Sequence, residues 1–536
     1  MYFDTGRACG CVILVGEKGE WAMDESIFVG GGGEGYGVAQ SLLLKFGNRH
    51  GLIAGATGTG KTVTLQVLAE GFSAAGVPVF MADVKGDLSG LGAAGSADHK
   101  LHEPFMKRAA TIGLDLQYRA FPVTFWDLFG ELGHPIRATV AEMGPLLLSR
   151  LLDLSEPQEG VLNVAFRLSD EEELPLLDLK DLQALLTFIA EHENEISSRY
   201  GLVSTTSIGA IQRSLLVLEN QGAAQMFGEP ALELADLMRL DENGAGRINI
   251  LAADKLMNRP RLYATFLLWL LSELFEELPE VGDPDKPRLV FFFDEAHLLF
   301  ADAPKALIAK VEQVARLIRS KGVGVYFITQ NPADVPENIL GQLGNRVQHA
   351  LRAFTARDQR DLRLASDTYR ANPRFVTEEA IRDVGTGEAV TSFLEAKGIP
   401  GIVERTLVRP PSSQLGPIDP AIRARLVAAS PMGTKYSVTV DRDSAHEKLR
   451  ARADRAKREA ADADQIKTRR DEADREFSNA RRYDDGGESF KPAPRPGSGR
   501  SDSIGETFAK SFARLLGSRS GQAVIRGILG SFFKKR

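Results

Sequence analysis

Residues 55–62 read Gly-Ala-Thr-Gly-Thr-Gly-Lys-Thr, and no other stretch constrains the fold of this chain as strongly. The stretch matches the pattern GxxxxGK[ST]. It follows a short apolar run at Gly51–Ala54 and precedes a helix-like run at Val63–Phe72. Glycines let such a loop curl until its backbone N–H groups point at an anion, and the next helix turns its positive end to the same place. The sequence therefore predicts a strand, a phosphate-binding loop and a helix, in that order.

The chemistry of the loop assigns it to nucleotide binding. Lys61 is expected to reach the β- and γ-phosphates, and the Thr62 hydroxyl is expected to hold Mg²⁺. The residues assigned to the nucleotide are Gly55, Ala56, Thr57, Gly58, Thr59, Gly60, Lys61 and Thr62. The expected ligands are ATP and Mg²⁺. A GTPase is disfavoured because the chain has no Asn-Lys-x-Asp motif, and a transport cassette because no Leu-Ser-Gly-Gly-Gln signature precedes Asp294.

A second motif ends a hydrophobic run, Leu289–Phe293, in two adjacent carboxylates, Asp294 and Glu295. A buried strand of this kind would deliver Asp294 beside the phosphate loop, where it can hold Mg²⁺. Glu295 would then orient the attacking water and accept its proton. The alternative is a surface turn with two solvated acids. The phosphate loop more than two hundred residues upstream favours the Mg²⁺ site.

Another apolar run, Val323–Thr329, ends in Gln330, which is placed to sense the γ-phosphate. A capping glutamine at a strand end is the alternative. An arginine that reaches the site of a neighbouring subunit would stabilise transition-state charge, and Arg346 is the favoured candidate over Arg316 and Arg319. An ordinary ion pair is an equally good explanation for any one of the three.

The order of apolar and amphipathic segments predicts an α/β fold with a central sheet of the parallel type. Residues 1–48 are expected to form a small β element, and residues 49–410 the nucleotide domain, with a helical insertion at 138–245. The further strands are expected at Val77–Ala82, Tyr118–Trp126, Arg247–Leu251 and Val347–Ala353, and the long helices at Arg261–Leu278 and Lys305–Ser320.

The chain changes character after about residue 410. Residues 411–500 are expected to contain a charged, solvent-exposed helix and a disordered linker, because opposite charges recur three or four residues apart at 441–482 and Gly, Pro and Ser follow. Residues 501–536 form a basic amphipathic tail. Such a tail suits DNA, an anionic membrane or a neighbouring subunit, unless its apolar face folds back on the protein itself.

Length, apolar runs, cysteine content and net charge limit the number of structural units, the location of the protein and its partners. A chain of 536 residues exceeds one ordinary core, so two or three structural units are expected. No apolar run reaches the roughly 20 residues of a membrane span. The two cysteines, Cys9 and Cys11, are expected to be reduced thiols, which favours the cytoplasm. The net charge of −7 does not indicate nucleic-acid binding, although a local patch would be hidden in that sum.

Taken in order, these motifs resemble the HerA/FtsK branch of P-loop ATPases, and most of all its HerA-like proteins of the YjgR type. The resemblance covers residues 1–410 and includes Asp83-Val84-Lys85-Gly86-Asp87, in which Asp87 stands where the family usually has an acidic residue. It implies a RecA-like core, a small N-terminal β element, hexameric rings and ATP-driven movement of DNA through a central pore. HerA itself works with a nuclease partner.

Two further functions compete with this DNA motor. One is a nucleotide-gated scaffold or chaperone-like ATPase that acts on protein, which the acidic balance leaves open. The other is a conjugation-type pump, which usually needs a membrane anchor, and no such segment is visible in the sequence.

Overall fold

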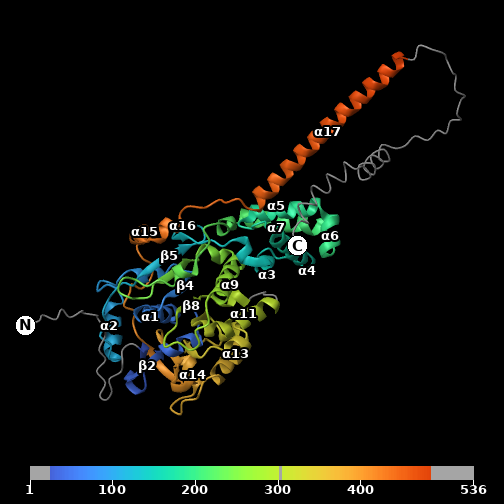
Figure 1. Cartoon of the computed structure of the whole chain (residues 1–536). Helices are drawn as coiled ribbons and strands as arrows, with labels where there is room; N and C mark the ends of the chain where they lie inside the picture. The colour runs from blue at the N-terminus through green and yellow to red at the C-terminus, as the bar shows by residue number, and fades with distance from the viewer. Residues whose placement is uncertain (1–24, 301–304, 485–536) are drawn as a thin grey trace, which may run out of the picture. The chain divides into compact units, whose positions relative to one another are not determined.

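The computed structural model describes residues 25–300 and 305–484 (Figure 1). The chain divides into two units. The first comprises Met1–Phe166 and Pro175–Ser444, and the second Arg167–Leu174 and Ala445–Arg536, each as far as the structure describes it. Cys9, Cys11 and the basic tail at 501–536 lie outside the described residues.

A sheet of 12 strands organises the first unit. In spatial order the strands are β2 (Val38–Leu43), β1 (Ser26–Gly32), β14 (Glu404–Val408), β11 (Glu388–Ser392), β10 (Asn345–Gln348), β3 (Gly51–Ala54), β9 (Val323–Thr329), β8 (Leu289–Phe293), β4 (Val79–Asp83), β7 (Ile248–Ala252), β5 (Val123–Asp127) and β6 (His134–Pro135). The strands from β10 to β6 are parallel, and those from β2 to β11 pair antiparallel with their neighbours and with β10. The expected α/β fold with a largely parallel sheet is confirmed.

Helices connect the parallel strands, and the central strands are therefore buried along their whole length. Every residue of β3, β4, β8 and β9 is buried, as helices on both faces of a parallel sheet require. The helices of this part are α1 (Lys61–Ala74), α2 (His102–Thr111), α9 (Pro260–Glu277), α10 (His297–Phe300), α11 (Lys305–Leu317), α12 (Glu337–Leu340), α13 (Ala356–Asp367) and α14 (Thr377–Asp383).

Aromatic packing holds α1 against the centre of the sheet. The ring of Phe72 lies 5.8 Å from that of Tyr326 on β9 and 6.3 Å from that of Phe292 on β8, centroid to centroid. All three side chains are fully buried. Because α1 begins at Lys61, this packing also fixes the start of the helix, where a phosphate would bind.

The N-terminal strands β1 and β2 extend the main sheet at its edge. Gly30 of β1 pairs with Val408 of β14. A Cβ at Gly30 would lie 2.2 Å from the carbonyl oxygen of Leu407, so the close approach of the two strands requires glycine at this position. The predicted small β element thus consists of two strands, β1 and β2, which extend the main sheet beyond β14. A separate two-stranded ribbon joins β12 (Leu394–Glu395) to β13 (Ile399–Pro400).

The predicted helical insertion lies between β6 and β7. Its helices are α3 (Val140–Leu151), α4 (Glu156–Glu171), α5 (Leu179–Glu191), α6 (Glu193–Tyr200), α7 (Thr205–Asn220) and α8 (Leu234–Leu237). Thr139 and Glu142 form a capping box that starts α3, and α3 packs against α9. In the described part of the chain no single helix meets the length and hydropathy needed to cross a membrane. Taken together, α6 and α7 meet both criteria, but they meet at a bend of 102°.

Residues 411–444 differ from the linker that the sequence predicts at this point. They fold onto the first unit and include α15 (Pro420–Ala429) and α16 (Met432–Tyr436). The ring of Tyr436 is buried 5.2 Å from that of Trp126, and its hydroxyl donates to Asp236 at 2.8 Å. A buried aromatic with a satisfied hydroxyl anchors this segment, which its Pro- and Ser-rich beginning does not reveal.

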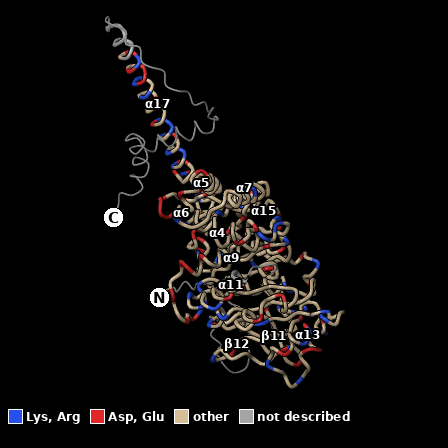
Figure 2. The backbone as a smooth tube through the Cα atoms, turned by 90° about the vertical axis from the view of Figure 1, so that its right-hand side faces the viewer, with Lys and Arg blue, Asp and Glu red and all other residues tan. Residues whose placement is uncertain are grey.

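The second unit contains the long helix α17 (Ala445–Asp484). Its side chains are exposed from Arg450 to Phe477, and Lys, Arg, Asp and Glu alternate along its length (Figure 2). The helix predicted from the spacing of opposite charges therefore exists, and it faces solvent from Arg450 to Phe477.

Candidate nucleotide site

The predicted motifs converge at one edge of the parallel sheet. Strands β3, β9, β8 and β4 are neighbours in that order, so the loops that follow them lie together at the carboxyl ends of the strands. A cavity of about 370 Å³ opens at this edge. The predicted site residues that line it are Thr57, Gly58, Gly60, Lys61, Thr62, Asp294 and Glu295.

The phosphate loop owes its shape to glycine. Gly55 and Gly60 have φ angles of 149° and 118°, which side chains rarely adopt. A Cβ on Gly55 would lie 2.5 Å from the Cβ of His349, so the loop also packs too closely for a side chain there. Behind the loop, the backbone N–H of Ala56 donates to the carbonyl of Ala350 and the Thr59 hydroxyl to the carbonyl of Ala56. The loop is thus held open toward the cavity.

Lys61 is folded back onto the loop in this structure. Its Nζ donates to the carbonyl oxygens of Gly55 at 2.5 Å and Ala56 at 3.1 Å. Burial lowers the pKa of Lys61, while the Glu295 carboxylate opposes that shift. The ammonium group therefore lies at the loop mouth, where a phosphate oxygen would compete for the same hydrogen bonds.

Thr62 lies close to the second acid of the Asp-x-Lys-Gly-Asp segment. Burial raises the pKa of Asp87, and the charge of Lys85 and the side chain of Thr62 both oppose that rise. Asp87 follows β4, and Thr62 begins α1. The acid of the Asp-x-Lys-Gly-Asp segment thus lies at the mouth of the phosphate loop.

Asp294 is fixed by its own backbone surroundings. Its Oδ1 accepts the backbone N–H of Glu295 at 2.9 Å, and its carbonyl accepts the hydroxyl of Tyr263 at 2.7 Å. Burial, followed by the charge of Glu295, raises the pKa of Asp294 to about 7. A partly buried carboxylate beside a second one is a place where a cation would be favourable.

Three side chains surround the carboxylate of Glu295, which is 7% exposed. Lys85 Nζ lies 3.8 Å from Oε1, while His297 Nδ1 and Gln330 Nε2 lie 3.3 Å and 3.5 Å from Oε2. Glu295 also has a positive φ of 49°, an uncommon conformation for a residue other than glycine. The backbone is thus turned so that the carboxylate points into the cavity and toward Gln330.

The oxygen donors at this point fit a Mg²⁺ ion. The Thr62 hydroxyl and the carboxylates of Asp294 and Asp87 are hard oxygen ligands, the type that Mg²⁺ prefers. Asp294 and Asp87 also raise each other's cost of ionisation, since the charge of Asp87 contributes to the raised pKa of Asp294. A divalent cation would relieve that repulsion, so the residues present suit the predicted metal.

Arg346, the favoured trans-acting arginine, lies away from the cavity lining. It is the second residue of β10 and pairs in register with Leu52, two residues before the end of β3. Its Nε donates to the carbonyl of Leu343 at 3.0 Å, and its Nη2 donates to that of Leu340 at 2.9 Å. Both donors are therefore engaged within the same chain, and a role toward a neighbouring subunit stays a prediction.

The two other arginine candidates form ion pairs within the chain. Arg316 contacts Glu312 at 2.8 Å, one turn earlier on α11, and Arg319 contacts Asp283 at 2.8 Å. Both side chains are at least one third exposed, so these pairs contribute little to stability. Both contacts are therefore ordinary ion pairs, which was the alternative that the sequence left open for these arginines.

Several residues of the site have no local sequence signal for their role. Lys85 and Asp87 belong to the Asp-x-Lys-Gly-Asp segment, but their place beside the phosphate loop depends on β4 lying next to β8, which no local pattern reveals. His349 supports the loop from behind. Its Nε2 lies 2.8 Å from the hydroxyl of Thr64, and its Nδ1 lies 2.9 Å from the carbonyl of Glu388. The available signal for His349 was its place in the run Val347–Ala353, where the sequence predicts a strand, although β10 itself ends at Gln348.

The family model described as helicase HerA-like C-terminal matches residues 34–536, which is nearly the whole chain. A comparison with curated proteins found no match.

Several solved structures are similar at low identity. The unbound bacterial conjugative coupling protein TrwBdeltaN70 is 17% identical, with 68% of this chain and 87% of that chain covered and a TM-score of 0.42. VirB4 of Thermoanaerobacter pseudethanolicus is 14% identical, with coverage of 72% and 96% and a TM-score of 0.44. TrwB in complex with ADP and Mg²⁺ is 18% identical, with coverage of 70% and 87% and a TM-score of 0.42.

Proposed function

Because this chain belongs to the helicase HerA-like family, we propose that it is an Mg²⁺-dependent ATP hydrolase whose turnover drives movement along double-stranded DNA. The observation that supports hydrolysis is the convergence of the phosphate loop, Asp294 and Glu295 on one cavity, with Gln330 in contact with Glu295. A site that only binds nucleotide would not need a buried carboxylate aimed into the cavity beside a strand-end glutamine.

The residues divide the chemistry among themselves. The N–H groups of the phosphate loop and the ammonium of Lys61 bind the phosphate oxygens. Thr62 and Asp294 would hold Mg²⁺, which would neutralise phosphate charge. Glu295 orients a water molecule, accepts its proton as the oxygen attacks the γ-phosphorus, and leaves ADP and phosphate as products. Gln330 contacts the same carboxylate and reports the state of the γ-phosphate to the loop beyond it.

Lys61 and Lys85 have to exchange partners when nucleotide binds. Lys61 now donates to carbonyls of its own loop, and phosphate oxygens are stronger, charged acceptors for the same ammonium. Lys85 is half exposed and faces Glu295, so a γ-phosphate would attract it away from that carboxylate. The released Glu295 could then accept a proton.

The assembly that we propose is a homo-oligomeric, hexameric ring with DNA in its pore. In such a ring Arg346 would leave the carbonyls of Leu340 and Leu343 to reach the neighbouring site. A nuclease partner is part of the same proposal. We place the protein in the cytoplasm, because its two cysteines suit a reducing compartment. The tail at 501–536 would contact DNA, an anionic membrane or the next subunit.

A nucleotide-gated scaffold that acts on protein is the second candidate, and the net charge of −7 favours it over a DNA motor. Steady-state ATP turnover, measured at low salt with and without long duplex DNA, separates the two. Low salt is needed because phosphate contacts weaken steeply with ionic strength.

The DNA-motor proposal predicts that duplex DNA raises turnover and that Lys61→Ala abolishes turnover under both conditions. If DNA leaves turnover unchanged and an unfolded protein raises it, the scaffold is correct and the DNA motor is wrong. If Lys61→Ala turns over ATP like the wild type, the site itself is misassigned.

A further inference from the structure

The cavity extends beyond the residues that handle phosphate. The order of the strands distinguishes the two ends of the cavity. β9, β8 and β4 lie on one side of β3, whereas β10, β11 and β14 lie on the other. Lys85, Asp294 and Glu295 follow strands of the first side and mark the γ-phosphate end. The opposite end of a bound nucleoside triphosphate, its ribose and base, must therefore point toward β11 and β14.

Four residues line the cavity on that second side or reach it. Thr386 and Gly387 lie directly before β11, and Pro410 follows β14, so all three are at the same edge of the sheet as the phosphate loop. Arg108 of α2 donates to the carbonyls of Thr386 at 3.2 Å and Gly387 at 3.3 Å. These bonds connect α2 to the loop before β11.

Phe105 lies on α2 one turn before Arg108 and also lines the cavity. Its side chain is partly exposed, unlike the fully buried aromatics of the sheet, and Pro410, although buried, adds an apolar residue to the same lining. An aromatic ring that is open to a cavity beside a phosphate site is suited to packing on a nucleobase.

A buried polar network holds Pro410 in place. We call the segment Arg409–Leu415 the strap. Glu70 of α1, which is 1% exposed, accepts the backbone N–H groups of Ser412 and Ser413, both at 2.9 Å, and the Ser413 hydroxyl at 2.7 Å. Arg409 balances the negative charge of the same carboxylate through an ion pair at 3.1 Å.

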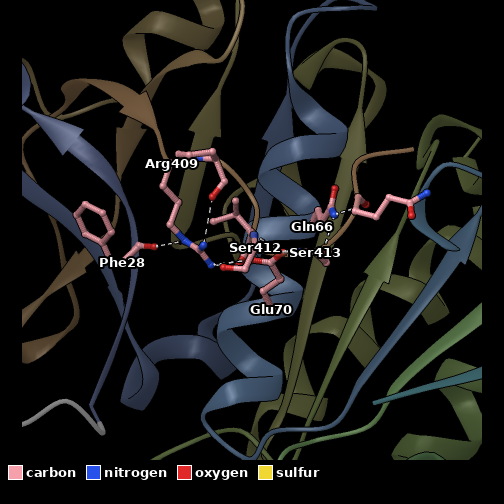
Figure 3. A network of polar contacts seen from close by, with 9 residues as sticks. Phe28, Gln66, Glu70, Arg409, Ser412 and Ser413 are labelled. Atoms are coloured by element: carbon pink, nitrogen blue, oxygen red, sulfur yellow. Dashed lines mark hydrogen bonds and ion pairs between the residues drawn. The ribbon is translucent and has the colours of Figure 1, made fainter. Parts of the chain in front are cut away.

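The strap is fastened at two further points, as Figure 3 shows. Gln66, one turn before Glu70, donates to the Ser413 hydroxyl at 2.6 Å and to the Gln414 carbonyl at 3.0 Å. Arg409 donates to the carbonyl of Phe28 on β1 at 3.0 Å. A carboxylate buried this deeply is tolerated only when every lone pair is satisfied, so the network fixes the strap on the helix that begins at the phosphate loop.

From these contacts we infer that Phe105, Arg108, Thr386, Gly387 and Pro410 form the subsite for the base and ribose of the bound nucleoside triphosphate. Phe105 and Pro410 pack on the nucleoside. Arg108 holds the loop before β11 beside the nucleoside through its bonds to Thr386 and Gly387. Glu70 is a positioning residue that acts through the strap. The inference rests on the proposed function, because it takes the phosphate end of the same cavity as given.

Competition binding distinguishes the nucleoside end from the phosphate end. A fluorescent ATP analogue is displaced by ATP and, separately, by inorganic tripolyphosphate, both with Mg²⁺, and a dissociation constant is obtained for each. Phe105→Ala is expected to weaken ATP roughly tenfold, the typical effect of losing one base–aromatic contact, and to leave tripolyphosphate unchanged. Phe105→Tyr should restore ATP binding. Met106→Ala is the control, since Met106 is the next, exposed residue of α2 and does not line the cavity.

Glu70→Gln tests the strap in the same assay. The amide loses the ion pair with Arg409, so ATP binding should weaken while tripolyphosphate binding stays at the wild-type value, with thermal unfolding measured alongside. Equal weakening of both ligands by Phe105→Ala, or no change in either, would overturn the inference and leave the proposed function intact. Wild-type binding of both ligands by Lys61→Ala would instead overturn the proposed function, and the subsite with it.

Discussion

At the scale of single residues, the chemistry of the site depends on how charge is shared around Glu295. The carboxylate is almost completely buried and lies 3.8 Å from the ammonium of Lys85, which is half exposed. The ammonium of Lys85 occupies the face of the carboxylate that a water molecule would have to approach, so the pair has to separate before that water is deprotonated. Nucleotide binding provides a reason for the separation, because a γ-phosphate competes for Lys85.

Lys85→Gln should therefore lower kcat for ATP much more than it weakens ATP binding. The lysine would stabilise charge that develops on the γ-phosphate, and loss of one such donor typically costs roughly a hundredfold in kcat. Single-turnover hydrolysis and equilibrium ATP binding separate the two effects. Lys107→Gln on α2 is the matched control, since Lys107 is exposed and does not line the cavity. A kcat equal to that of the wild type would exclude Lys85 from catalysis.

The site could be predicted at this scale only where its residues are contiguous in the sequence. The phosphate loop and the Asp294–Glu295 pair each form one uninterrupted motif, so their residue types and spacing carry the chemistry. Lys85, Phe105 and Arg108 reach the cavity from separate elements, and only the fold brings them there. The partners of Arg346, two backbone carbonyls, also have no sequence signal.

At the scale of elements, the buried parallel strands were predictable and the antiparallel edge was not. Leu289–Phe293 and Val323–Thr329 are continuous apolar runs, and β8 and β9 have these same bounds. β11 and β14 each have only two adjacent apolar residues among Glu, Thr, Ser and Arg, so each resembles a loop or an exposed strand. They belong to the sheet because β10 and β1 pair with them.

His50 lies at the joint between β3 and β9, and its burial predicts a pH-dependent stability. Its Nδ1 accepts the backbone N–H of Val325 at 3.0 Å, and burial, with smaller contributions from Arg319 and Arg49, lowers its pKa from 6.5 to about 4. Between these two values the unfolded chain binds a proton that the folded chain does not. The free energy of unfolding should therefore fall as the pH drops from 6.5 to 4, by at most about 3 kcal/mol from this residue.

His50→Asn tests this prediction without changing the local geometry. Asparagine tolerates the positive φ of 59° at this position and places an oxygen acceptor where Nδ1 now lies, but it does not titrate. Denaturant unfolding at pH 7.5 and pH 4.5 should show a smaller loss of stability for the variant than for the wild type. Equal losses would mean that His50 does not contribute to the pH dependence.

At the scale of the whole molecule, the sequence predicted an α/β nucleotide unit followed by a charged helix, and both exist. The end of the first unit was placed too early, because residues 411–444 are attached by contacts to distant residues such as Glu70 and Trp126. Polar, proline-rich segments of this kind resemble linkers when their partners are far away in the sequence. Oligomeric state depends on surfaces of several chains and stays a prediction.

If the protein forms a ring with shared sites, two inactive variants should complement each other. Subunits with Arg346→Ala keep an intact Glu295, and subunits with Glu295→Gln keep an intact Arg346. Mixed rings would contain some sites with both residues, and part of the ATP turnover should return. Native mass measurement must confirm the mixing. An absence of rescue in confirmed mixed rings would exclude Arg346 as the trans-acting arginine.

The central claim is that Glu295 activates water at a site where the phosphate loop binds ATP. Glu295→Gln tests it most directly, because the amide keeps the shape and the contact with Gln330 but accepts a proton poorly. Phosphate release and equilibrium binding of ATP with Mg²⁺ are measured on the same preparation. We predict wild-type affinity for ATP and a loss of turnover by roughly a hundredfold or more. Turnover at the wild-type rate would contradict the account.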